Sequence, residues 1–327
     1  MKREIKKILL IQPPAFVLDD KSDMNPNVPL GIAYIAGVLE ERRYEVKILD
    51  AFVEGLENEI PVDEGRVLIG LTSDQIEKAI KECKPDVVGV SSLFTMQRRN
   101  AHNVCAIAKK AAPGTVVVMG GAHPSAEPEM VLKDPNVDFV VIGEGEMVMA
   151  ELMKRLGEGS GLSDLDGIAF RDGGKIKVNR KQEYVKDLDA LPLPARHLLP
   201  MNKYFKFKKS HGINRRSPYA SIVTSRGCPF GCTFCSTHIV WGRLYRARSA
   251  ENVLKEIRHL VKEYGIRELL FEDDNLTLNR ERAFEIFRGM VNEKFDLIWR
   301  TPNGVAVKTI DEEMLVIMKE SGCYQLG

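Results

Sequence analysis

Three cysteines lie close together in the second half of the chain, at Cys228, Cys232 and Cys235. The 327 residues contain only six cysteines, so half of them fall in this short stretch. Thiolates are soft ligands that suit iron–sulfur clusters and zinc. Because the spacing is so tight, it predicts metal binding rather than a disulfide framework. Three thiolates would leave one iron of a four-iron cluster without a protein ligand.

The cysteines directly follow an apolar run, YASIVT, that we predict to be a strand. They therefore stand in a loop at the carboxyl end of a strand, where α/β barrels build active sites. Gly227 and Gly231 let backbone amides approach a cluster without a Cβ in the way. A closed zinc site completed by His238 is the alternative interpretation of the same residues.

The pattern C-x3-C-x-aromatic-C after a strand resembles the radical S-adenosylmethionine (SAM) superfamily. The resemblance implies an oxygen-sensitive [4Fe–4S] cluster on Cys228, Cys232 and Cys235, with SAM chelated to the open iron. One electron from the cluster would then cleave a C–S bond of SAM and release a 5′-deoxyadenosyl radical. It also implies a partner that delivers the electron, such as a flavodoxin or ferredoxin.

The same resemblance implies where SAM is held. Phe234 matches the aromatic position that lies near the adenine in this family. The contact to the amino group of SAM comes from the end of the second barrel strand, which places it on Glu272 and Asp273. This chain lacks the Gly-Gly-Glu sequence common there, and a helix cap is the alternative role for these acidic residues. Arg300 and Asn303 close the next strand and would face the same end of the barrel.

The region 218–327 alternates strands with helices and predicts the first half of a (β/α)6 partial barrel. The family continues to six strands, so we expect that this chain is truncated inside the radical SAM domain and that the fragment alone is inactive. We expect strands at 219–224, 267–271, 297–301 and 323–327, and helices at about 250–263, 280–292 and 311–321.

Residues 1–156 show a second alternation of the same kind. Continuous aliphatic runs are typical of strands buried on both faces. We therefore predict a doubly wound, parallel, five-stranded sheet of the Rossmann-like or flavodoxin-like type, with every strand-to-helix loop on one edge. The five runs are Ile8–Ile11, Val46–Leu49, Val87–Val90, Thr115–Met119 and Phe139–Ile142.

Small residues gather in the loops at that edge, in the segments PLGIAYIAGVLE, MGGAHP and DFVVIGEGE. These segments resemble the cobalamin-binding domain that precedes some radical SAM domains. The resemblance implies a cobalamin (B12) site at the carboxyl ends of the strands. The candidate contacts are Pro29, Gly31, Phe52, Ser91, Ser92, Gly120, Gly121, Gly143, Glu144 and Gly145.

Cobalamin domains of the methionine synthase type carry D-x-H-x-x-G, whose histidine binds cobalt from below. The corresponding stretch here is Asp50-x-Phe52-x-x-Gly55, and a phenylalanine cannot bind cobalt. The lower face of a bound cobalamin should therefore lack that ligand, unless His123 supplies it. A dinucleotide fold is excluded because QPPAFV, and no glycine-rich turn, follows the first strand. A flavodoxin-like domain without a ligand stays open.

Residues 157–217 predict a connector that packs on both domains. A hairpin is expected around Asp172, Gly173 and Gly174. The following stretch, DLDALPLPARHLLP, carries three prolines and should be extended.

The composition narrows the classes of protein further. Hydrophobic residues make up 44% and charged residues 28%, and the formal net charge is +1, so no basic field predicts nucleic-acid binding. The first apolar run, Ile8–Ile11, is too short for a signal sequence or a membrane span. We expect a cytoplasmic enzyme that works without oxygen.

The resemblance implies methylation of an unreactive carbon as the reaction, and the substrate, a small molecule or a peptide, is unknown. Two alternatives carry the same two domains. One is a radical cyclase or rearrangement enzyme of the anaerobic Mg-protoporphyrin cyclase type. The other is a non-catalytic cobalamin-binding module.

Overall fold

The computed structural model describes residues 4–63 and 65–327. The chain forms two compact units. Unit 1 comprises the described residues up to Met24 together with Pro29–Val185 and Pro192–Met201. Unit 2 comprises Asn25–Val28, Lys186–Leu191 and Asn202–Gly327, so the expected connector is divided between the two units.

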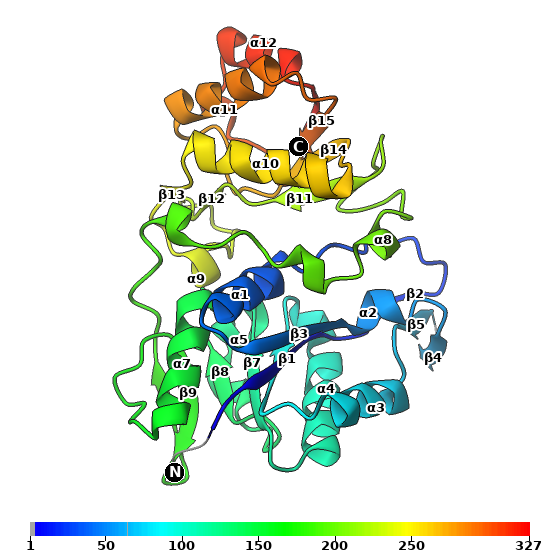
Figure 1. The fold of residues 1–327 in the computed structure, drawn as a ribbon, viewed down its shortest axis with the longest axis vertical. Coiled ribbons are helices and arrows are strands. Elements are labelled where there is room, and N and C mark those ends of the chain that lie inside the picture. The colour runs from blue at the N-terminus through cyan, green and yellow to red at the C-terminus, as the bar shows by residue number, and fades with distance from the viewer. Residues whose placement is uncertain (1–3, 64) are drawn as a thin grey trace. The chain divides into compact units, whose positions relative to one another are not determined.

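Unit 1 is built on a seven-stranded sheet with the order β10-β9-β8-β7-β6-β1-β3 (Figure 1). Five of these strands are parallel, as the sequence predicts. The parallel strands are β1 (Lys7–Gln12), β3 (Glu45–Asp50), β6 (Val87–Ser91), β7 (Val116–Gly120) and β8 (Phe139–Val141).

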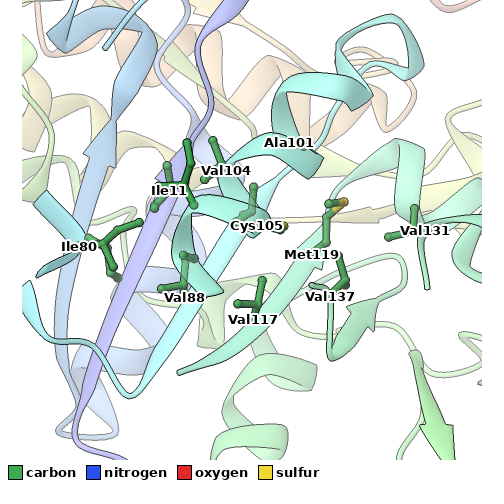
Figure 2. Packing of buried hydrophobic residues seen from close by; sticks show 14 of the residues in the cluster. Ile11, Ile80, Val88, Ala101, Val104, Cys105, Val117, Met119, Val131 and Val137 are labelled. Atoms are coloured by element: carbon green, nitrogen blue, oxygen red, sulfur yellow. The ribbon is translucent and has the colours of Figure 1, made fainter. Parts of the chain in front are cut away.

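Helices cover both faces of this sheet. Figure 2 shows Ile11, Val88 and Val117 of the strands packed with Ile80 of α3 (Ser73–Cys83) and Val104 of α4 (Arg98–Ala111). The opposite face carries α1 (Leu30–Glu41) and α7 (Glu146–Glu158). The inner strands bury aliphatic side chains on both faces, which explains their apolar runs, whereas the edge strand β3 leaves Lys47 exposed.

Two parts of unit 1 differ from the expectation. The hairpin β9 (Ile168–Asp172) and β10 (Lys175–Asn179) is antiparallel and extends the main sheet instead of standing in a separate connector. A small antiparallel sheet also forms, which the sequence did not predict. It comprises β2 (Ala15–Leu18), β4 (Glu59–Asp63) and β5 (Arg66–Ile69).

Unit 2 holds a four-stranded parallel sheet of order β11-β14-β15-β16, as expected for the start of a barrel. The strands are β11 (Tyr219–Ile222), β14 (Glu268–Phe271), β15 (Ile298–Thr301) and β16 (Cys323–Leu326). Helices α10 (Ala250–Tyr264), α11 (Arg280–Asn292) and α12 (Glu312–Glu320) pack on one face of it.

Aromatic rings fill the core between that sheet and its helices. Trp299 is fully buried, with its ring centroid 5.1 Å from that of Phe271 and 4.9 Å from that of Phe287. The other face of the sheet is polar: Ser221, Glu268 and Arg300 are buried there. In β14 the alternation of Glu268 with Leu269 separates the two faces, as the pleat of a strand requires.

The remaining elements are short. They are α2 (Ala51–Glu54), α5 (Ala122–Ala126), α6 (Pro128–Val131), α8 (Met201–Tyr204), α9 (His238–Trp241), β12 (Ser225–Arg226), β13 (Arg246–Ala247), and the 3₁₀ turns η1 (Thr95–Gln97), η2 (Leu188–Ala190), η3 (Arg196–Leu198) and η4 (Val307–Thr309). None of the helices in the described part of the chain could span a lipid bilayer.

Candidate functional site

The cysteine loop of unit 2, defined as residues 227–245, has a clamped base. Strands β12 and β13 pair in antiparallel fashion on either side of it, with Ser225 opposite Ala247. Gly227 takes a left-handed conformation (φ +80°), and a Cβ there would lie 2.3 Å from the carbonyl oxygen of Leu244. Only glycine permits so close an approach of two backbones. The loop therefore begins and ends at fixed points.

Arginines of the two flanking strands reinforce the same base. The guanidinium of Arg226 lies over the ring of Trp241, 4.8 Å from its centroid. Arg246 donates a hydrogen bond from Nη2 to the carbonyl oxygen of Trp241, at 2.8 Å. Both arginines are buried, so these contacts form in surroundings where polar interactions are strong.

The three cysteines carried by the loop are free thiols. Cys232 is exposed, and Cys228 and Cys235 are partly exposed. Among residues 4–63 and 65–327, no three His, Cys, Asp or Glu side chains are gathered as a metal site. Instead, the Sγ of Cys235 lies 3.1 Å from the Oγ1 of Thr237. The structure thus places the thiols on one loop but does not bring their sulfur atoms together.

The chemistry of this donor set still fits an iron–sulfur cluster. Three accessible thiols stand on a short loop, and bonds between thiolates and metal supply the free energy that closes such loops. The turn in which the backbone N–H of Cys235 donates to the carbonyl of Cys232, at 3.2 Å, already folds the loop back on itself. The ligand assignment stays a prediction.

Phe234 is 90% exposed, beside Cys235. We predicted that this ring lies near the adenine of SAM, and the structure leaves it in solvent without a packing partner of the core. An exposed aromatic ring on a ligand-binding loop is available to stack on a flat group.

Asp273 anchors the entry to the cysteine loop. Its carboxylate accepts hydrogen bonds from the backbone N–H of Thr224 (3.1 Å), from the hydroxyl of Thr224 (2.7 Å) and from the hydroxyl of Ser225. The side chain is 1% exposed, and burial raises the pKa of the carboxyl. Arg282 of α11 donates to the carbonyl of Thr224, at 2.8 Å. The structure therefore gives Asp273 a role in holding the loop, and its predicted contact with SAM stays a prediction.

Asp274 follows it and lies against the same loop. Its Oδ2 is buried and has no hydrogen-bond partner among the described residues. Burial and the neighbouring Asp273 raise the pKa of its carboxyl to about 6, although a hydrogen bond from the backbone N–H of Gly227 opposes the rise. A buried carboxyl with an open oxygen is typical of sites that receive a ligand.

Glu272, the other acidic residue predicted to contact SAM, reaches the polar face of the sheet. Its Oε1 accepts from the hydroxyl of Ser221, at 3.0 Å. Its Oε2 lies 2.9 Å from the Nδ1 of His211, and Asn303 donates to its backbone carbonyl, at 2.9 Å. Arg300, by contrast, is 3% exposed and donates hydrogen bonds to the backbone carbonyls of Ser210 and His211. Sequence reasoning did not anticipate the contact of His211.

In unit 1, three of the buried polar atoms that lack partners among the described residues lie at the carboxyl edge of the parallel strands. They are the Oε1 of Gln12 at the end of β1, the Oγ of Ser92 after β6 and the Nε2 of His123 after β7. These three strands are neighbours in the sheet. Because an unsatisfied buried polar atom costs stability, such a group at a sheet edge indicates a ligand site. Gln12 was not among the predicted contacts, although its position at a strand end was visible.

The edge also carries open space and an apolar loop. A Cβ added at Gly31, at the start of α1, would meet nothing within 4 Å. After β6, the side chains of Leu93, Phe94 and Met96 are 50%, 64% and 72% exposed. Exposed apolar side chains beside unsatisfied polar atoms suit a large ligand that is flat and apolar in the centre and polar at its rim.

The other predicted cobalamin contacts divide into two groups. The accessible group lies in the loops at the strand ends and comprises Ser91, Gly120, Gly121, Gly143 and Gly145, all partly buried. Within it, Gly121 (φ +115°) is required because a Cβ would lie 2.6 Å from the carbonyl oxygen of Ser92. The buried group serves the fold: Pro29 caps α1, Phe52 is 8% exposed and Glu144 accepts from the backbone N–H of Val185, at 2.8 Å.

The stretch Asp50 to Gly55 forms a capped helical turn. The Oδ1 of Asp50 accepts from the backbone N–H groups of Phe52 (3.1 Å) and Val53 (3.0 Å). A Cβ at Gly55 would lie 2.2 Å from the backbone nitrogen of Leu71, which explains the glycine. The buried side chain of Phe52 therefore occupies, within this capped turn, the position at which the methionine synthase type has its histidine.

His123, the other histidine considered as a cobalt ligand, is 2% exposed. Its Nδ1 lies 3.2 Å from the Oγ1 of Thr95, and its backbone N–H donates to the carbonyl of Ser92, at 3.1 Å. Burial lowers the pKa of the imidazole, so the neutral form is favoured. His123 thus joins the loops that follow β6 and β7.

Two known protein families match separate parts of this chain. Residues 24–153 match the B12 binding domain, and residues 222–327 match the radical SAM superfamily. The chain is 39% identical, over 99% of its length, to cytidylyl-2-hydroxyethylphosphonate methyltransferase of Streptomyces wedmorensis. The chain belongs to the radical SAM superfamily and carries a B12-binding domain. This radical SAM chain spans 65% of that relative's length.

A second relative of the radical SAM chain has a different activity in its name. The anaerobic magnesium-protoporphyrin IX monomethyl ester cyclase of Rubrivivax gelatinosus is 30% identical over 91% of the chain, which covers 51% of that protein.

Two solved radical SAM structures share the fold. TsrM from Kitasatospora setae, a methyltransferase solved with cobalamin and a [4Fe–4S] cluster bound, matches 98% of this chain with a TM-score of 0.72 and 18% identity, over 58% of its own chain. OxsB, solved with aqua-cobalamin and SAM bound, matches 98% of this chain with a TM-score of 0.74 and 20% identity, over 43% of its own chain.

Replacing Asp273 by alanine should weaken unit 2 and the cysteine loop together. The change leaves the buried amide of Thr224 unsatisfied, which costs about 1–3 kcal/mol. We expect a lower urea midpoint and less iron bound after anaerobic reconstitution. Asp273→Asn should lose less, because it keeps one acceptor. The control is Asp296→Ala, whose carboxylate pairs on the surface with Arg216 and Arg267. Equal behaviour of the two alanine variants would contradict the anchoring role.

The pKa of His211 should lie above its ordinary value of about 6.5. The hydrogen bond to Glu272 raises it most, whereas burial and the charge of Arg300 lower it. A raised pKa means that the link stabilises the fold at acidic pH and that this stabilisation is lost as pH rises through the folded-state pKa. NMR titration of the imidazole should show the midpoint falling in Glu272→Gln. An unchanged midpoint would show that the carboxylate is not the cause.

Proposed function

We propose that this radical SAM chain binds a [4Fe–4S] cluster through Cys228, Cys232 and Cys235 and cleaves SAM reductively. The observation that carries the proposal is the set of three free thiols on one loop, clamped by β12 and β13 at the carboxyl end of β11. When bound, the cluster supplies the single electron that breaks a C–S bond of SAM. A partner such as a flavodoxin or ferredoxin would deliver that electron.

The residues of the chain have separate tasks in this scheme. Asp273 and Arg282 hold the start of the loop that carries the three thiols. Glu272 offers carboxylate oxygens to the ammonium group of SAM. Phe234 is free to stack on the adenine ring, because no protein group covers it. These assignments place all contacts to SAM within unit 2.

Unit 1 is proposed to bind cobalamin at its carboxyl edge. The unsatisfied atoms of Gln12 and Ser92 offer hydrogen bonds to the amide groups at the rim of a corrin, and the space over Gly31 admits its bulk. When bound, cobalamin supplies a cobalt that can carry a methyl group. His123 is not proposed as the lower ligand, because its Nε2 is enclosed by protein and its other nitrogen contacts Thr95.

Methylation of an unreactive carbon is the favoured overall reaction, and the methyltransferase relative supports it. Ring formation is the second candidate, because the cyclase relative aligns with 91% of the same chain. Assay of the reconstituted protein for 5′-deoxyadenosine and S-adenosylhomocysteine separates these candidates. Both products indicate methylation, and deoxyadenosine alone indicates another radical reaction.

Each of Cys228→Ala, Cys232→Ala and Cys235→Ala should abolish the cluster. Anaerobic reconstitution of the wild type should give about four irons and four sulfides per chain, with the visible absorption of a [4Fe–4S] cluster. The control is Cys323→Ala, which changes a thiol of β16 outside the loop and should keep the metal. Zinc in place of iron, with no visible absorption, would overturn the proposal.

Replacing Gly31 by phenylalanine should block cobalamin without harming the fold. A Cβ there meets no protein atom within 4 Å, so the added ring would project into the space assigned to the cofactor. The matched control is Gly114→Phe, because Gly114 is equally open and lies before β7, at the amino end of that strand. After incubation with hydroxocobalamin and gel filtration, we expect at least a tenfold lower corrin content in Gly31→Phe alone. Equal retention by both variants would refute this site.

A further inference from the structure

The polar face of the sheet in unit 2 is covered by a segment that precedes the first barrel strand. We define this segment, residues 210–216, as the lumen segment. Two buried side chains of the strands bind its backbone. Glu268 accepts hydrogen bonds from its amides, and Arg300 donates hydrogen bonds to its carbonyls. The segment comes from the region that the sequence predicted to be a simple connector.

Glu268 fixes the carboxyl end of the lumen segment. Its Oε2 accepts from the backbone N–H groups of Arg215, at 2.7 Å, and Arg216, at 2.6 Å. Its Oε1 accepts from the hydroxyl of Tyr324, at 2.6 Å. Glu268 is 0% exposed, so these bonds hold a buried charge that would be costly to leave unpaired.

Arg300 fixes the amino end. It donates from Nη2 to the carbonyl of Ser210 and from Nη1 to the carbonyl of His211, both at 2.7 Å. Gly212 is needed here, because its φ is +116° and a Cβ would lie 3.0 Å from the Nη1 of Arg300. His211 itself has a left-handed φ of +53°. A backbone strained in this way persists only where its surroundings determine it.

The consequence is that the side chain of His211 faces Glu272, 2.9 Å from its Oε2. The side chain of Glu272 is only 17% exposed. With Ser221 on its other oxygen, the carboxylate has one firm donor on each side. A carboxylate offers about four lone-pair positions, so it can accept a further donor while both of these bonds persist.

We propose that His211 is a positioning residue for Glu272, and that the lumen segment forms one wall of the SAM pocket. This inference rests on the proposed function, in which Glu272 accepts the ammonium group of SAM. The imidazole fixes the carboxylate in one orientation before SAM arrives. Binding then avoids the entropy cost of ordering that side chain.

Two variants of His211 test this role in the 327-residue chain with its cluster reconstituted. His211→Ala removes the donor. His211→Asn is the conservative variant, because its amide can donate in place of Nδ1 and asparagine tolerates a left-handed φ. The matched control is His197→Ala, which removes a more exposed histidine paired with Glu40 in unit 1, at 3.2 Å. All three keep the cysteines and Glu272.

SAM is the probe, followed by calorimetric titration and by the change that it causes in the EPR spectrum of the reduced cluster. We expect the dissociation constant for SAM to rise about tenfold in His211→Ala, because this variant loses one charge-assisted hydrogen bond to Glu272. It should stay within about twofold in His211→Asn and in His197→Ala. Iron content and the EPR spectrum without SAM should be the same in all four proteins.

The outcomes separate this inference from the function on which it rests. A wild type that holds the cluster and does not bind SAM overturns the proposed function and the inference together. A wild type that binds SAM as tightly as His211→Ala overturns only the inference. Equal losses in His211→Ala and His211→Asn, with a lower urea midpoint in both, would assign His211 to the fold and would also overturn it.

Discussion

One buried carboxylate decides where the cysteine loop begins. The backbone ladder between β11 and β14 ends where the N–H of Glu272 donates to the carbonyl of Ile222, at 2.9 Å. Beyond that point, the side chain of Asp273 takes over and accepts the amide of Thr224. The chain can therefore leave the sheet at a defined residue and enter the β12–β13 clamp. Without the hydrogen bonds of Asp273, the loop would start from a strand end that is held less firmly in place.

The same physical rule applies to both units. In both, parallel strands end at one edge, and polar groups at that edge lack some of their protein partners. Gln12, Ser92 and His123 show this in unit 1, and Asp274 shows it in unit 2. Each unsatisfied atom lowers the stability of the protein alone. Proteins tolerate such costs where a ligand restores the missing interactions.

Much of the fold could be predicted from the sequence, because most parallel strands of unit 1 are aliphatic runs and those of unit 2 alternate with helical segments. The β2-β4-β5 sheet could not, since β4 is exposed throughout and contains Pro61, which opposes a strand assignment. The hairpin of β9 and β10 was predicted, but its place in the main sheet depends on pairing with β8, which local sequence does not encode.

The candidate site was less predictable than the fold. The cysteines, Glu272 and the glycine loops stand at strand ends and could be found from local pattern. Asp273 has the same pattern, yet its environment makes it an anchor, because burial is decided by residues far away in the sequence. The contact between His211 and Glu272 joins positions 61 residues apart and depends on a left-handed backbone. No local signal predicts such a pair.

The antiparallel hairpin that ends the sheet of unit 1 also affects how the protein meets copies of itself. A bare edge of a parallel sheet offers unpaired amides and carbonyls to any extended chain. Here the outermost strand on one side is β10, which points two exposed lysines, Lys175 and Lys177, into solvent. A second molecule that added a strand there would bring like charges together. Exposed lysines on an outermost strand are a feature that opposes edge-to-edge pairing of sheets.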